Sequence, residues 1–578
     1  MTEGRIVAYQ LADYLQSVGV EFIFGLCGHT NIAFLDALGK SEIRFITSRH
    51  EQVAAHMADG YARASGKPGV LLTHLGPGLT NAATGVANAS LDAVPMVVIA
   101  GDVPTHYFGR HPHQEINLNL DADQFEIFRP FCKRIWRVER PSELPRVIER
   151  AFHIAQSGKP GAVLVDVPMD VFSADLPAGS FQRQPPKFIA RPALDQADAA
   201  RIAQLLMNAE KPVIHVGGGV LRDRASEALI ALAEFLQCPV THTLMGKGSI
   251  PDRHPLNAGM TGFWGTPLAN DLCRTADVIL AVGTRLAEAD SSSWDPRFTF
   301  AIPPTRLIHI EIDPNELGRN FPTEIGAVSD SSFALQAIFG QAKVIRSTPI
   351  EHEDLIEKIR LGRDEFAEQW QAETTSDQFP LRPERILADV RAVLPEDGLL
   401  VTDVGWNKNG VGQQFDITVP GSFITPGAFA TMGFGPAAAL GVKLARPDMP
   451  VLALVGDGAF SSNMSVVATA MEAEIPVVWL VMDNQAFGTI ALLEKHHYGW
   501  SYGCTFERGG EPFGVDYAAV ARACGAKGIN ITSADQLASE LEIALASDEP
   551  TLIQVRMENV PTPTPGYWNI NDIYRAGE

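Results

Sequence analysis

Two apolar segments in the last third of the chain end in polar residues, within the stretch LALVGDGAFSSNMSVVATAMEAEIPVVWLVMDNQAFG (452–488). The first segment ends in Gly-Asp-Gly around Asp457, and the second ends in Asp-Asn at Asn484. Short apolar segments bounded by turn residues are typical of strands buried in a parallel sheet. Because ligands of such sheets bind beyond the carboxyl ends of the strands, the stretch predicts a binding site at these two residues.

The residue types at these strand ends favour a magnesium ion next to a phosphate group. Asp457 and Asn484 supply hard oxygen ligands, and we expect the backbone carbonyl of Ala486 to add a third. Backbone N–H groups at the start of the following helix attract phosphate. A single Gly-Asp-Gly is also compatible with a plain strand-to-helix turn, so the prediction depends on the pair. The chain has no Walker sequence, so a nucleotide site of that type is not indicated.

The rest of the chain alternates short apolar segments with helix-like segments, as parallel α/β proteins do. Because 578 residues exceed a single domain, we expect three α/β domains with parallel sheets, at 1–175, 193–345 and 380–557. A Pro-rich linker at 175–195 and a charged helix at 345–380 connect them. The predicted strands are 21–26, 69–74, 95–101, 162–168, 212–220, 276–286, 306–314, 398–405, 451–458, 477–484 and 551–557.

Charge and cysteine content narrow the function classes. The chain has 46 Lys and Arg against 68 Asp and Glu, and its formal net charge of -22 argues against a nucleic-acid partner. The 6 cysteines have no short C-x-x-C spacing, which indicates small buried side chains in a reducing compartment. No apolar segment reaches the roughly 20 residues of a membrane span, and the first residues lack a signal-peptide pattern. We therefore expect a cytoplasmic protein without a membrane partner.

The Gly-Asp-Gly and Asn pair resembles the signature of the thiamine diphosphate enzyme superfamily. Four further segments resemble the same family: SRHEQVAAHMADGYAR (48–63), GPGLTNAATGVANA (76–89), DVGWNKN (403–409) and FATMGFGPAAALG (429–441). The resemblance implies a pyrimidine-binding first domain, a central Rossmann-like domain and a diphosphate-binding third domain, with thiamine diphosphate and Mg2+ as cofactors. The residues that it places at the cofactor are Glu51, Gly76, Asn81, Val404, Gly405, Trp406, Asn407, Ala430, Met432, Gly456, Gly458, Ala459, Gly488 and Thr489.

Within this resemblance, Glu51 matches the glutamate that hydrogen-bonds the aminopyrimidine ring of the cofactor. The C2 proton of the thiazolium must be removed by a base, and the cofactor's own amino group can act if a carboxyl group exchanges its proton. We therefore expect Glu51 to be catalytic and Met432 to be the apolar prop that bends the cofactor. Glu51 could instead be a carboxylate that only stabilises the start of a helix.

Two segments, HPHQEI (111–116) and HIEIDPNELGRN (309–320), resemble the acetolactate synthase-like branch of this superfamily. In that branch a similar Gln-Glu pair reaches the active site, so Gln114 is a catalytic candidate.

Glycine-containing turns in the central block lie where this branch binds an adenine dinucleotide such as FAD, or the ADP part of coenzyme A. They are GGG (217–219), THTLMGKG (241–248) and GTRLAEAD (283–290). A purely structural Rossmann-like turn explains such short motifs equally well. Arg222 and Arg285 lie close to these turns and are predicted substrate contacts.

The helix after the Asn motif departs from the acetolactate synthases, which carry a Trp where this chain has Leu493 followed by Glu494. The arrangement resembles the 2-hydroxyacyl-CoA lyases of the branch, which cleave a 2-hydroxyacyl-CoA to formyl-CoA and a carbonyl compound. We expect Glu494 to move a proton on and off a hydroxyl group, with Ile490 and Leu493 lining the substrate. Glu494 could equally be a solvated helix carboxylate paired with a neighbour such as Lys495.

A second departure is the histidine in LCGHTN, a turn that is apolar or glycine-rich in the synthases. We expect His29 and His74 to face the thiazolium, where a neutral imidazole could donate to a developing alkoxide. Core histidines bonded to the backbone are the alternative.

The primary functional prediction is a thiamine diphosphate- and Mg2+-dependent carbon-carbon lyase or carboligase of the 2-hydroxyacyl-CoA lyase type, acting on an acyl-CoA. The alternative is an acetolactate synthase-type 2-oxoacid decarboxylase and carboligase with FAD in the central domain. A binding fold without catalysis would be indicated if Glu51 or Asp457 were absent, but both are present. Because the family takes its glutamate and diphosphate site from different subunits, we expect at least a homodimer, and a homotetramer as the full assembly.

The C-terminal tail, residues 558–578, combines prolines with aromatic residues. A disordered end is the simplest interpretation, but the tail is apolar for a solvated segment. We expect it to close over the active-site mouth as a lid. The apolar residues concerned are Tyr567, Trp568, Ile570, Ile573 and Tyr574.

Overall fold

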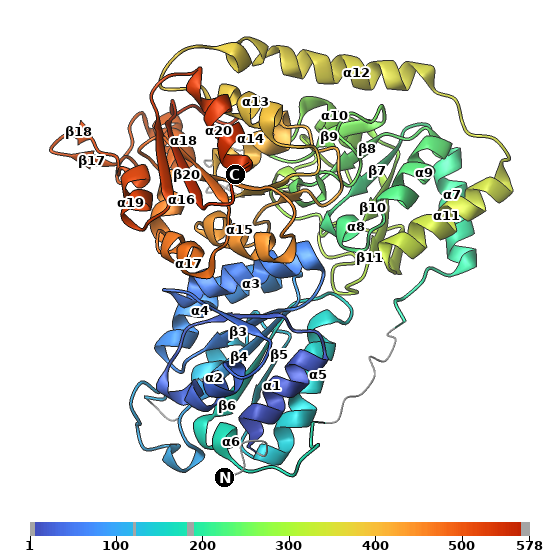
Figure 1. The fold of residues 1–578 in the computed structure, drawn as a ribbon. Coiled ribbons are helices and arrows are strands. Elements are labelled where there is room, and N and C mark those ends of the chain that lie inside the picture. The colour runs from blue at the N-terminus through green and yellow to red at the C-terminus, as the bar shows by residue number, and fades with distance from the viewer. Residues whose placement is uncertain (1–5, 119–122, 182–189, 568–578) are drawn as a thin grey trace.

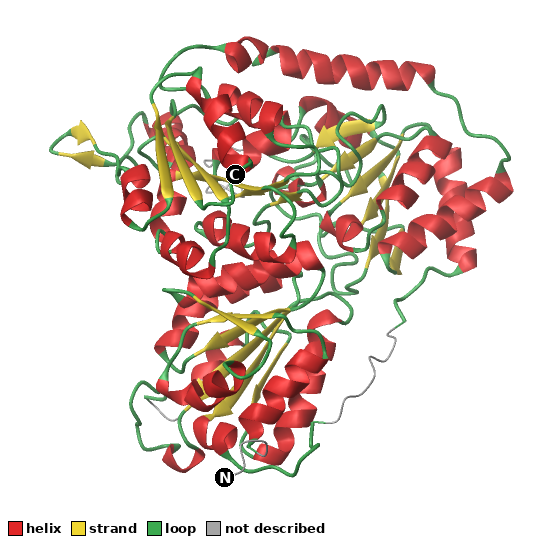
Figure 2. Ribbon diagram, viewed as in Figure 1, coloured by secondary structure: helices red, strands yellow, loops and turns green. Residues whose placement is uncertain are grey.

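The computed structural model describes residues 6–118, 123–181 and 190–567 of the chain. Its framework is three six-stranded parallel sheets, each covered by helices (Figures 1 and 2). A two-stranded hairpin, β17 (Glu507–Arg508) and β18 (Glu511–Pro512), projects from the third domain. The predicted fold class is confirmed, while the exact domain boundaries stay a prediction.

The first sheet has the strand order β2-β1-β3-β4-β6-β5. Apolar residues line both of its faces: α1, α2, α5 and α6 pack on one face, and α3 and α4 on the other. The strands are β1 (Phe22–Gly25), β2 (Arg44–Thr47), β3 (Gly69–Thr73), β4 (Met96–Asp102), β5 (Arg134–Arg137) and β6 (Ala162–Pro168). The helices are α1 (Val7–Ser17), α2 (Ile32–Leu38), α3 (Glu51–Ser65), α4 (Pro77–Leu91), α5 (Leu144–Gln156) and α6 (Met169–Ser173).

The third sheet, β14-β13-β15-β16-β20-β19, repeats the order of the first when its strands are counted from its own start. Its strands are β13 (Leu399–Thr402), β14 (Phe423–Ile424), β15 (Val451–Gly456), β16 (Val478–Asp483), β19 (Lys527–Ile531) and β20 (Thr551–Arg556). Its helices are α13 (Pro383–Val393), α14 (Trp406–Gln414), α15 (Phe434–Ala445), α16 (Asp457–Ser462), α17 (Val466–Ala473), α18 (Gly488–Tyr498), α19 (Tyr517–Ala523) and α20 (Gln536–Leu545).

The central sheet has the order β12-β11-β10-β7-β8-β9, which is the Rossmann order when read from its other end. Its strands are β7 (Pro212–Val216), β8 (Val240–His242), β9 (Asn257–Met260), β10 (Val278–Val282), β11 (Arg306–Glu311) and β12 (Ile325–Val328). Its helices are α7 (Gln196–Asn208), α8 (Gly218–Arg222), α9 (Ser226–Leu236), α10 (Pro267–Thr275) and α11 (Ser331–Ile345). The long helix α12 (Glu353–Glu368) then leads to the third domain (Figure 1).

The first and third domains join through α3 and α15, which lie side by side (Figure 1). Two glycines allow their backbones to touch, because a Cβ at Gly60 would collide with the carbonyl oxygen of Ala438, and one at Gly441 with that of Met57. Position 57 thus faces 441 and position 60 faces 438, so the two helices run antiparallel. Each helix follows the second strand of its own domain, so equivalent elements of two similar domains form the interface.

The antiparallel packing places the two ends of α3 against opposite edges of the third sheet. Near its start, Arg49 pairs with Glu472 at 2.5 Å and Arg44 donates to the carbonyl oxygen of Ala473 at 3.1 Å, just before β16 begins. Near its end, Arg63 donates to the carbonyl oxygen of Thr425 at 3.0 Å, just after β14 ends. The start of α3 therefore lies at the amino edge of the third sheet, and its end at the carboxyl edge.

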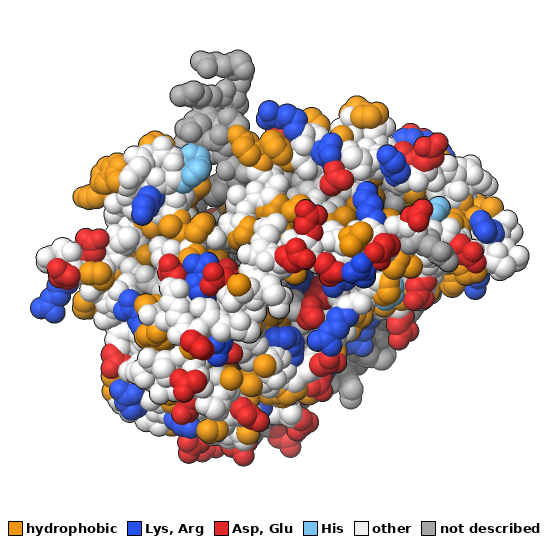
Figure 3. All heavy atoms as spheres, turned by 90° about the horizontal axis from the view of Figure 1, so that it is seen from above, with side chains coloured by type: hydrophobic (Ala, Val, Ile, Leu, Met, Phe, Trp, Pro, Cys, Tyr) orange, Lys and Arg blue, Asp and Glu red, His pale blue; other side chains and the backbone are white. Residues whose placement is uncertain are grey.

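Two further observations concern membrane spans and surface charge. No helix in the described ranges is long and apolar enough to cross a membrane. On the face seen from above, Lys and Arg side chains are scattered among Asp and Glu rather than gathered in one patch (Figure 3).

Candidate active site

Glu51 is the first residue of α3 and is almost completely buried, with 4% of its surface exposed. Its Oε2 accepts a hydrogen bond from Nδ2 of Asn81 at 3.0 Å, and a Cβ at Gly78 would come within 3.3 Å of its Oε1. The His50 side chain caps the helix by accepting from the backbone N–H of Gln52. A carboxylate that only stabilised the helix start would not require burial or the bond from Asn81.

His74 follows β3, and protein groups occupy both of its ring nitrogens. Nε2 lies 2.9 Å from Oε1 of Gln114, and Nδ1 lies 2.8 Å from Oγ1 of Thr30. Because an amide oxygen only accepts, Nε2 carries the proton and the Thr30 hydroxyl donates to Nδ1. Burial lowers the pKa of His74, which keeps the imidazole neutral.

His29 stands beside His74 but is exposed to solvent. It begins the short helix η1 (His29–Asn31) after β1, and its ring meets the His74 ring edge-on with centroids 4.6 Å apart. Gly28 makes room for this pair, because a Cβ there would collide with the His74 ring. Within the described ranges the His29 imidazole makes no hydrogen bond. Of the two predicted histidines, His29 is therefore the one with a free ring nitrogen.

The turn at Gly76 holds the segment that carries Gln114. Gly76 has a φ of 44°, and a Cβ there would collide with the carbonyl oxygen of Gln114. Its N–H donates to Oε1 of Gln124 at 2.7 Å. The carboxyl ends of the adjacent strands β1, β2 and β3 bring His29, Glu51 and His74 to one edge. Gln114, from the segment after β4, joins them through its contacts with His74 and Gly76.

Asp457 begins α16 at the carboxyl end of β15 and is 2% exposed. Burial and the neighbouring carboxyl group of Asp483 raise the pKa of Asp457 to about 7. Asn484 follows on β16; its Oδ1 accepts from the N–H of Ala486 at 3.3 Å and its Nδ2 donates to Asn559 at 3.2 Å. Two adjacent buried carboxyl groups, with the amide oxygen of Asn484 after the neighbouring strand, form a donor set that suits a divalent cation, so the residues fit Mg2+.

Open space beside this donor set fits an anionic group. A Cβ at Gly456 would meet nothing closer than Nδ2 of Asn407 at 3.8 Å, and one at Gly405 nothing closer than 3.9 Å, from Asn407 and Thr489. The helices α14 and α18 begin next to Gly405 and Thr489. Backbone N–H groups at helix starts attract phosphate, so these residues fit a diphosphate.

Asp403 organises the same region, and the sequence interpretation did not single it out. Its buried carboxylate accepts from the N–H groups of Val404 at 2.7 Å, Gly433 at 3.2 Å and Gly435 at 2.7 Å. Burial raises its pKa to about 6. Asn407 accepts from the Asp403 N–H at 3.1 Å and donates to Val404. Its place at a strand end, like that of Asp457, was the available signal.

The predicted apolar prop, Met432, is 40% exposed immediately before α15. Ala430 has a φ of 49°, so the loop turns sharply there. Trp406 is buried, and its indole N–H has no hydrogen-bond partner among the described residues.

Close packing explains the small residues that follow the predicted metal ligands Asp457 and Asn484. A Cβ at Gly458 would lie 2.6 Å from the Phe487 ring, and one at Gly488 would collide with Asn484. Ala459 is buried at 3% exposure.

Glu494 is in an environment that argues against the predicted acid-base role. Its Oε2 accepts from Oγ of Ser501 and from the N–H of Tyr502, both at 2.9 Å. These bonds, that from Tyr502 first, lower its pKa, whereas a group that takes and returns a proton works best with a pKa near the working pH. Glu494 thus holds the turn after α18. In the predicted substrate pair, Ile490 is 51% exposed and Leu493 is half-buried.

The predicted contacts of the central domain already have protein partners. Arg222 donates to Asp223 at 2.9 Å, and Arg285 donates across the domain boundary to the carbonyl oxygen of Leu91 at 2.9 Å. The glycine turn packs on Gly283, where a Cβ at Gly219 would lie 2.7 Å from its Cα. This backbone packing accounts for the glycines without a ligand, so the nucleotide site stays a prediction.

The described part of the tail, residues 558–567, crosses to the central domain. Nε2 of Gln413 donates to the carbonyl oxygen of Pro563 at 2.8 Å, and the Tyr567 ring stacks on Phe298 with centroids 4.5 Å apart. The remaining residues of the lid hypothesis, Trp568, Ile570, Ile573 and Tyr574, lie outside the described residues.

The two groups of predicted residues are far apart within one chain. Glu51 lies near the amino edge of the third sheet, because Arg49 contacts Glu472 there. Asp457 lies at the opposite edge, at the end of the six-residue strand β15, which spans roughly 20 Å at ~3.3 Å per residue. One chain alone therefore does not bring Glu51 to Asp457.

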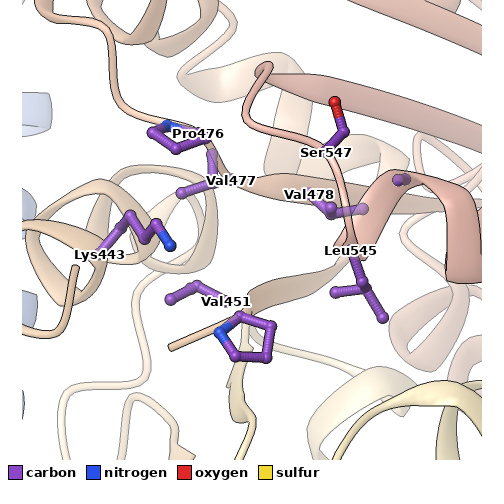
Figure 4. Close-up of a pocket in the computed structure, with 9 residues that line it drawn as sticks. Lys443, Val451, Pro476, Val477, Val478, Leu545 and Ser547 are labelled. Carbon is purple, nitrogen blue, oxygen red and sulfur yellow. The ribbon is translucent and has the colours of Figure 1, made fainter. Parts of the chain in front are cut away.

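A cavity at the amino edge of β15 and β16 is too small for a cofactor (Figure 4). Its volume is ≈ 20 Å³, and its one charged side chain, Lys443, donates to the carbonyl oxygens of Pro447 and Met449.

Family models match all three domains. The N-terminal thiamine pyrophosphate-binding domain matches residues 5–127, the central domain of thiamine pyrophosphate enzymes matches 199–338, and the C-terminal binding domain matches 403–555. The chain belongs to the thiamine pyrophosphate enzyme family. Thiamine pyrophosphate is thiamine diphosphate, so the predicted superfamily and its thiamine diphosphate cofactor are confirmed.

Relatives align with nearly the whole chain. The probable acetolactate synthase large subunit of Methanocaldococcus jannaschii is 35% identical, over 96% of this chain and 92% of that protein. The acetolactate synthase large subunit of Parasynechococcus marenigrum is 35% identical over 97% and 90%, and the isozyme 2 large subunit of Escherichia coli is 33% identical over 96% and 97%. These relatives confirm the acetolactate synthase-like branch. They do not support the resemblance to 2-hydroxyacyl-CoA lyases, which corrects the primary functional prediction.

Proposed function

We propose that this thiamine diphosphate enzyme is a Mg2+-dependent 2-oxoacid decarboxylase and carboligase of the acetolactate synthase type. The proposal is carried by the relatives that bear this name and align over nearly the full chain. It also agrees with the environment of Glu494, because hydrogen bonds from Tyr502 and Ser501 lower the pKa of this carboxyl group. When bound, the cofactor supplies the carbon nucleophile that releases CO2 from one 2-oxoacid and joins the remaining acyl group to a second carbonyl compound.

The chain's own residues divide the remaining work. Asp457, Asn484 and the Ala486 carbonyl hold Mg2+, and the backbone near Gly405 and Thr489 holds the diphosphate. Glu51, buried and fixed by Asn81, exchanges a proton with the pyrimidine.

His29 donates a proton to the substrate oxygen on which negative charge develops. Its ring nitrogens have no hydrogen-bond partner among the described residues, whereas those of His74 are bonded to Gln114 and Thr30. His74 is thus a positioning residue that supports the His29 ring.

The complete site takes Glu51 from one chain and Asp457 from a second copy. This assignment is supported by the separation of the two residues at opposite edges of the third sheet. A homodimer is then the smallest active form, and a homotetramer is two such dimers.

Bound FAD in the central domain completes the proposal. The Rossmann strand order and the turns near Gly219 and Gly283 are compatible with a dinucleotide. The predicted ADP or coenzyme A ligands belong to the less favoured lyase hypothesis.

Products distinguish the two hypotheses. The protein is incubated with thiamine diphosphate, Mg2+ and FAD, and offered pyruvate or a short 2-hydroxyacyl-CoA side by side, with mass spectrometry of the products. We expect 2-acetolactate and CO2 from pyruvate. Formyl-CoA from the thioester, with no product from pyruvate, would restore the lyase hypothesis.

A further inference from the structure

We propose that Asp92, in the first domain, is a positioning residue that fixes the cofactor loop of the third domain, residues 425–433. The inference rests on the proposed cofactor site, since this loop carries Met432. Asp92 is the residue that ends α4, and its side chain is completely buried. No sequence motif marks it.

The carboxylate of Asp92 binds two successive backbone N–H groups of the loop. Its Oδ2 accepts from Gly427 at 2.8 Å and its Oδ1 from Ala428 at 2.7 Å. Charge-assisted bonds of this length are among the stronger hydrogen bonds in proteins. Both oxygens of Asp92 are therefore directed at the loop.

Arg63 completes the contact from the same domain. Its Nη2 donates to Oδ2 of Asp92 at 2.8 Å, its Nε to Asp59 at 2.6 Å, and its Nη1 to the carbonyl oxygen of Thr425 at 3.0 Å. Only 10% of its side chain is exposed. The ion pair thus neutralises the buried Asp92 while adding another bond to the loop.

The third and central domains hold the same loop from the other side. The buried Lys408 donates through Nζ to the carbonyl oxygen of Pro426 at 3.2 Å. Met245 of the central domain packs so closely that a Cβ at Gly427 would lie 2.6 Å from its sulfur. All four residues from Thr425 to Ala428 are therefore fixed, and the Asp403 carboxylate fixes the loop again at Gly433.

The position of Asp92 is unfavourable for its own helix, because the C-terminus of a helix carries partial negative charge. Helix stability therefore does not account for this carboxylate, whereas its bonds to the loop do. Between the two fixed ends, Phe429 and Met432 remain 41% and 40% exposed.

Hydrogen exchange of full-length protein tests the role of Asp92 independently of the reaction. We expect D92N to speed exchange in peptides that cover 425–433 at least tenfold, and to raise the Kd for thiamine diphosphate at least tenfold with Mg2+ present. The matched control is D59N, which removes the other carboxylate bonded to Arg63 and leaves the bonds from Gly427 and Ala428 intact. We expect D59N to leave exchange in 425–433 unchanged.

A second variant covers the case in which D92N does not fold. D92E keeps the charge next to Arg63 but displaces both oxygens, so it should produce the same two changes at smaller size. The proposal is overturned if folded D92N or D92E leaves loop exchange and cofactor affinity at the wild-type values, or if D59N changes them equally. Neither readout requires acetolactate formation, so failure of the proposed reaction would be recognised separately.

Discussion

The first and third sheets share one strand order, but their carboxyl edges carry different chemistry. After the equivalent strands β3 and β15 come His74 and Asp457. After β1 and β13 come His29 and Asp403. The shared topology decides where a ligand can bind, and the residue types decide whether the edge handles protons or holds a metal and a diphosphate.

The two ends of the α3-α15 pair differ as well. At one end, the Arg49-Glu472 pair is exposed, with 43% and 52% of the side chains accessible. At the other end, the Arg63-Asp92 pair is buried, with 10% and 0% accessible. The first domain is therefore joined firmly to the cofactor loop of its own chain and weakly at the Glu51 end, where the proposed second copy completes the site.

The largest expected effect comes from changing the proton-handling edge itself. Glu51→Gln keeps the shape and the contact with Asn81, but removes the exchangeable proton. We expect turnover of pyruvate to fall about a hundredfold to ten-thousandfold, with an unchanged melting temperature. A rate close to wild type at saturating cofactor would refute the assignment of Glu51.

The two histidines at that edge should differ in how much their loss lowers turnover. We expect His29→Ala to lower kcat by about a hundredfold, because its imidazole is the proposed proton donor. His74→Phe should lower kcat less, because the His74 ring supports the His29 ring rather than the substrate. If His74→Phe lowers kcat more than His29→Ala does, the two roles are reversed.

Acid stability probes the shared core between the outer domains. His56 of α3 is buried against the Phe434 ring, both of its ring nitrogens lack partners among the described residues, and burial lowers its pKa to about 3. The unfolded chain binds a proton on His56 near pH 6.5, whereas the folded chain does not bind it until the pH is about 3. The free energy of unfolding is therefore unaffected by His56 above pH 6.5 and decreases as the pH falls toward 3. At pH 5 this decrease is about 2 kcal/mol.

Replacement of His56 should remove this pH dependence. We expect the urea concentration at the midpoint of unfolding to fall between pH 8 and pH 5 by more for wild type than for His56→Leu. An equal shift of the two proteins between these pH values would show that His56 does not contribute.

The smallest effect belongs to the exposed end of the helix pair. Glu472→Gln breaks the surface ion pair with Arg49, which should cost less than about 1 kcal/mol and leave turnover unchanged. Urea unfolding and steady-state kinetics measure both. If Glu472→Gln lowers the free energy of unfolding as much as D92N does, the exposed and buried ends of the α3-α15 pair are equally important, and the difference drawn between them is wrong.

Strands buried on both faces were predictable because apolar side chains fill them, as in β3, β4, β15 and β16. Short strands such as β14, which has two residues, were not predictable, because two residues are too few to show a periodic pattern. Residues that follow buried strands, such as Asp457, were predictable from topology.

The role of Asp92 could not be predicted, because its partners Gly427 and Ala428 come from a segment more than 300 residues away. The hydrogen bonds of Glu494 were not predictable for a related reason. Its partners, Ser501 and Tyr502, lie in a turn whose path the sequence did not reveal.

A mixture of two inactive variants tests most directly whether the two edges come from different chains. Glu51→Gln and Asp457→Ala are each expected to be inactive, and they are co-expressed with different tags or allowed to exchange subunits. In a mixed dimer one site then combines an intact Glu51 with an intact Asp457, so random mixing should recover about a quarter of wild-type turnover. Absence of any recovery in purified mixed dimers would place both residues of each site in the same chain and contradict the account.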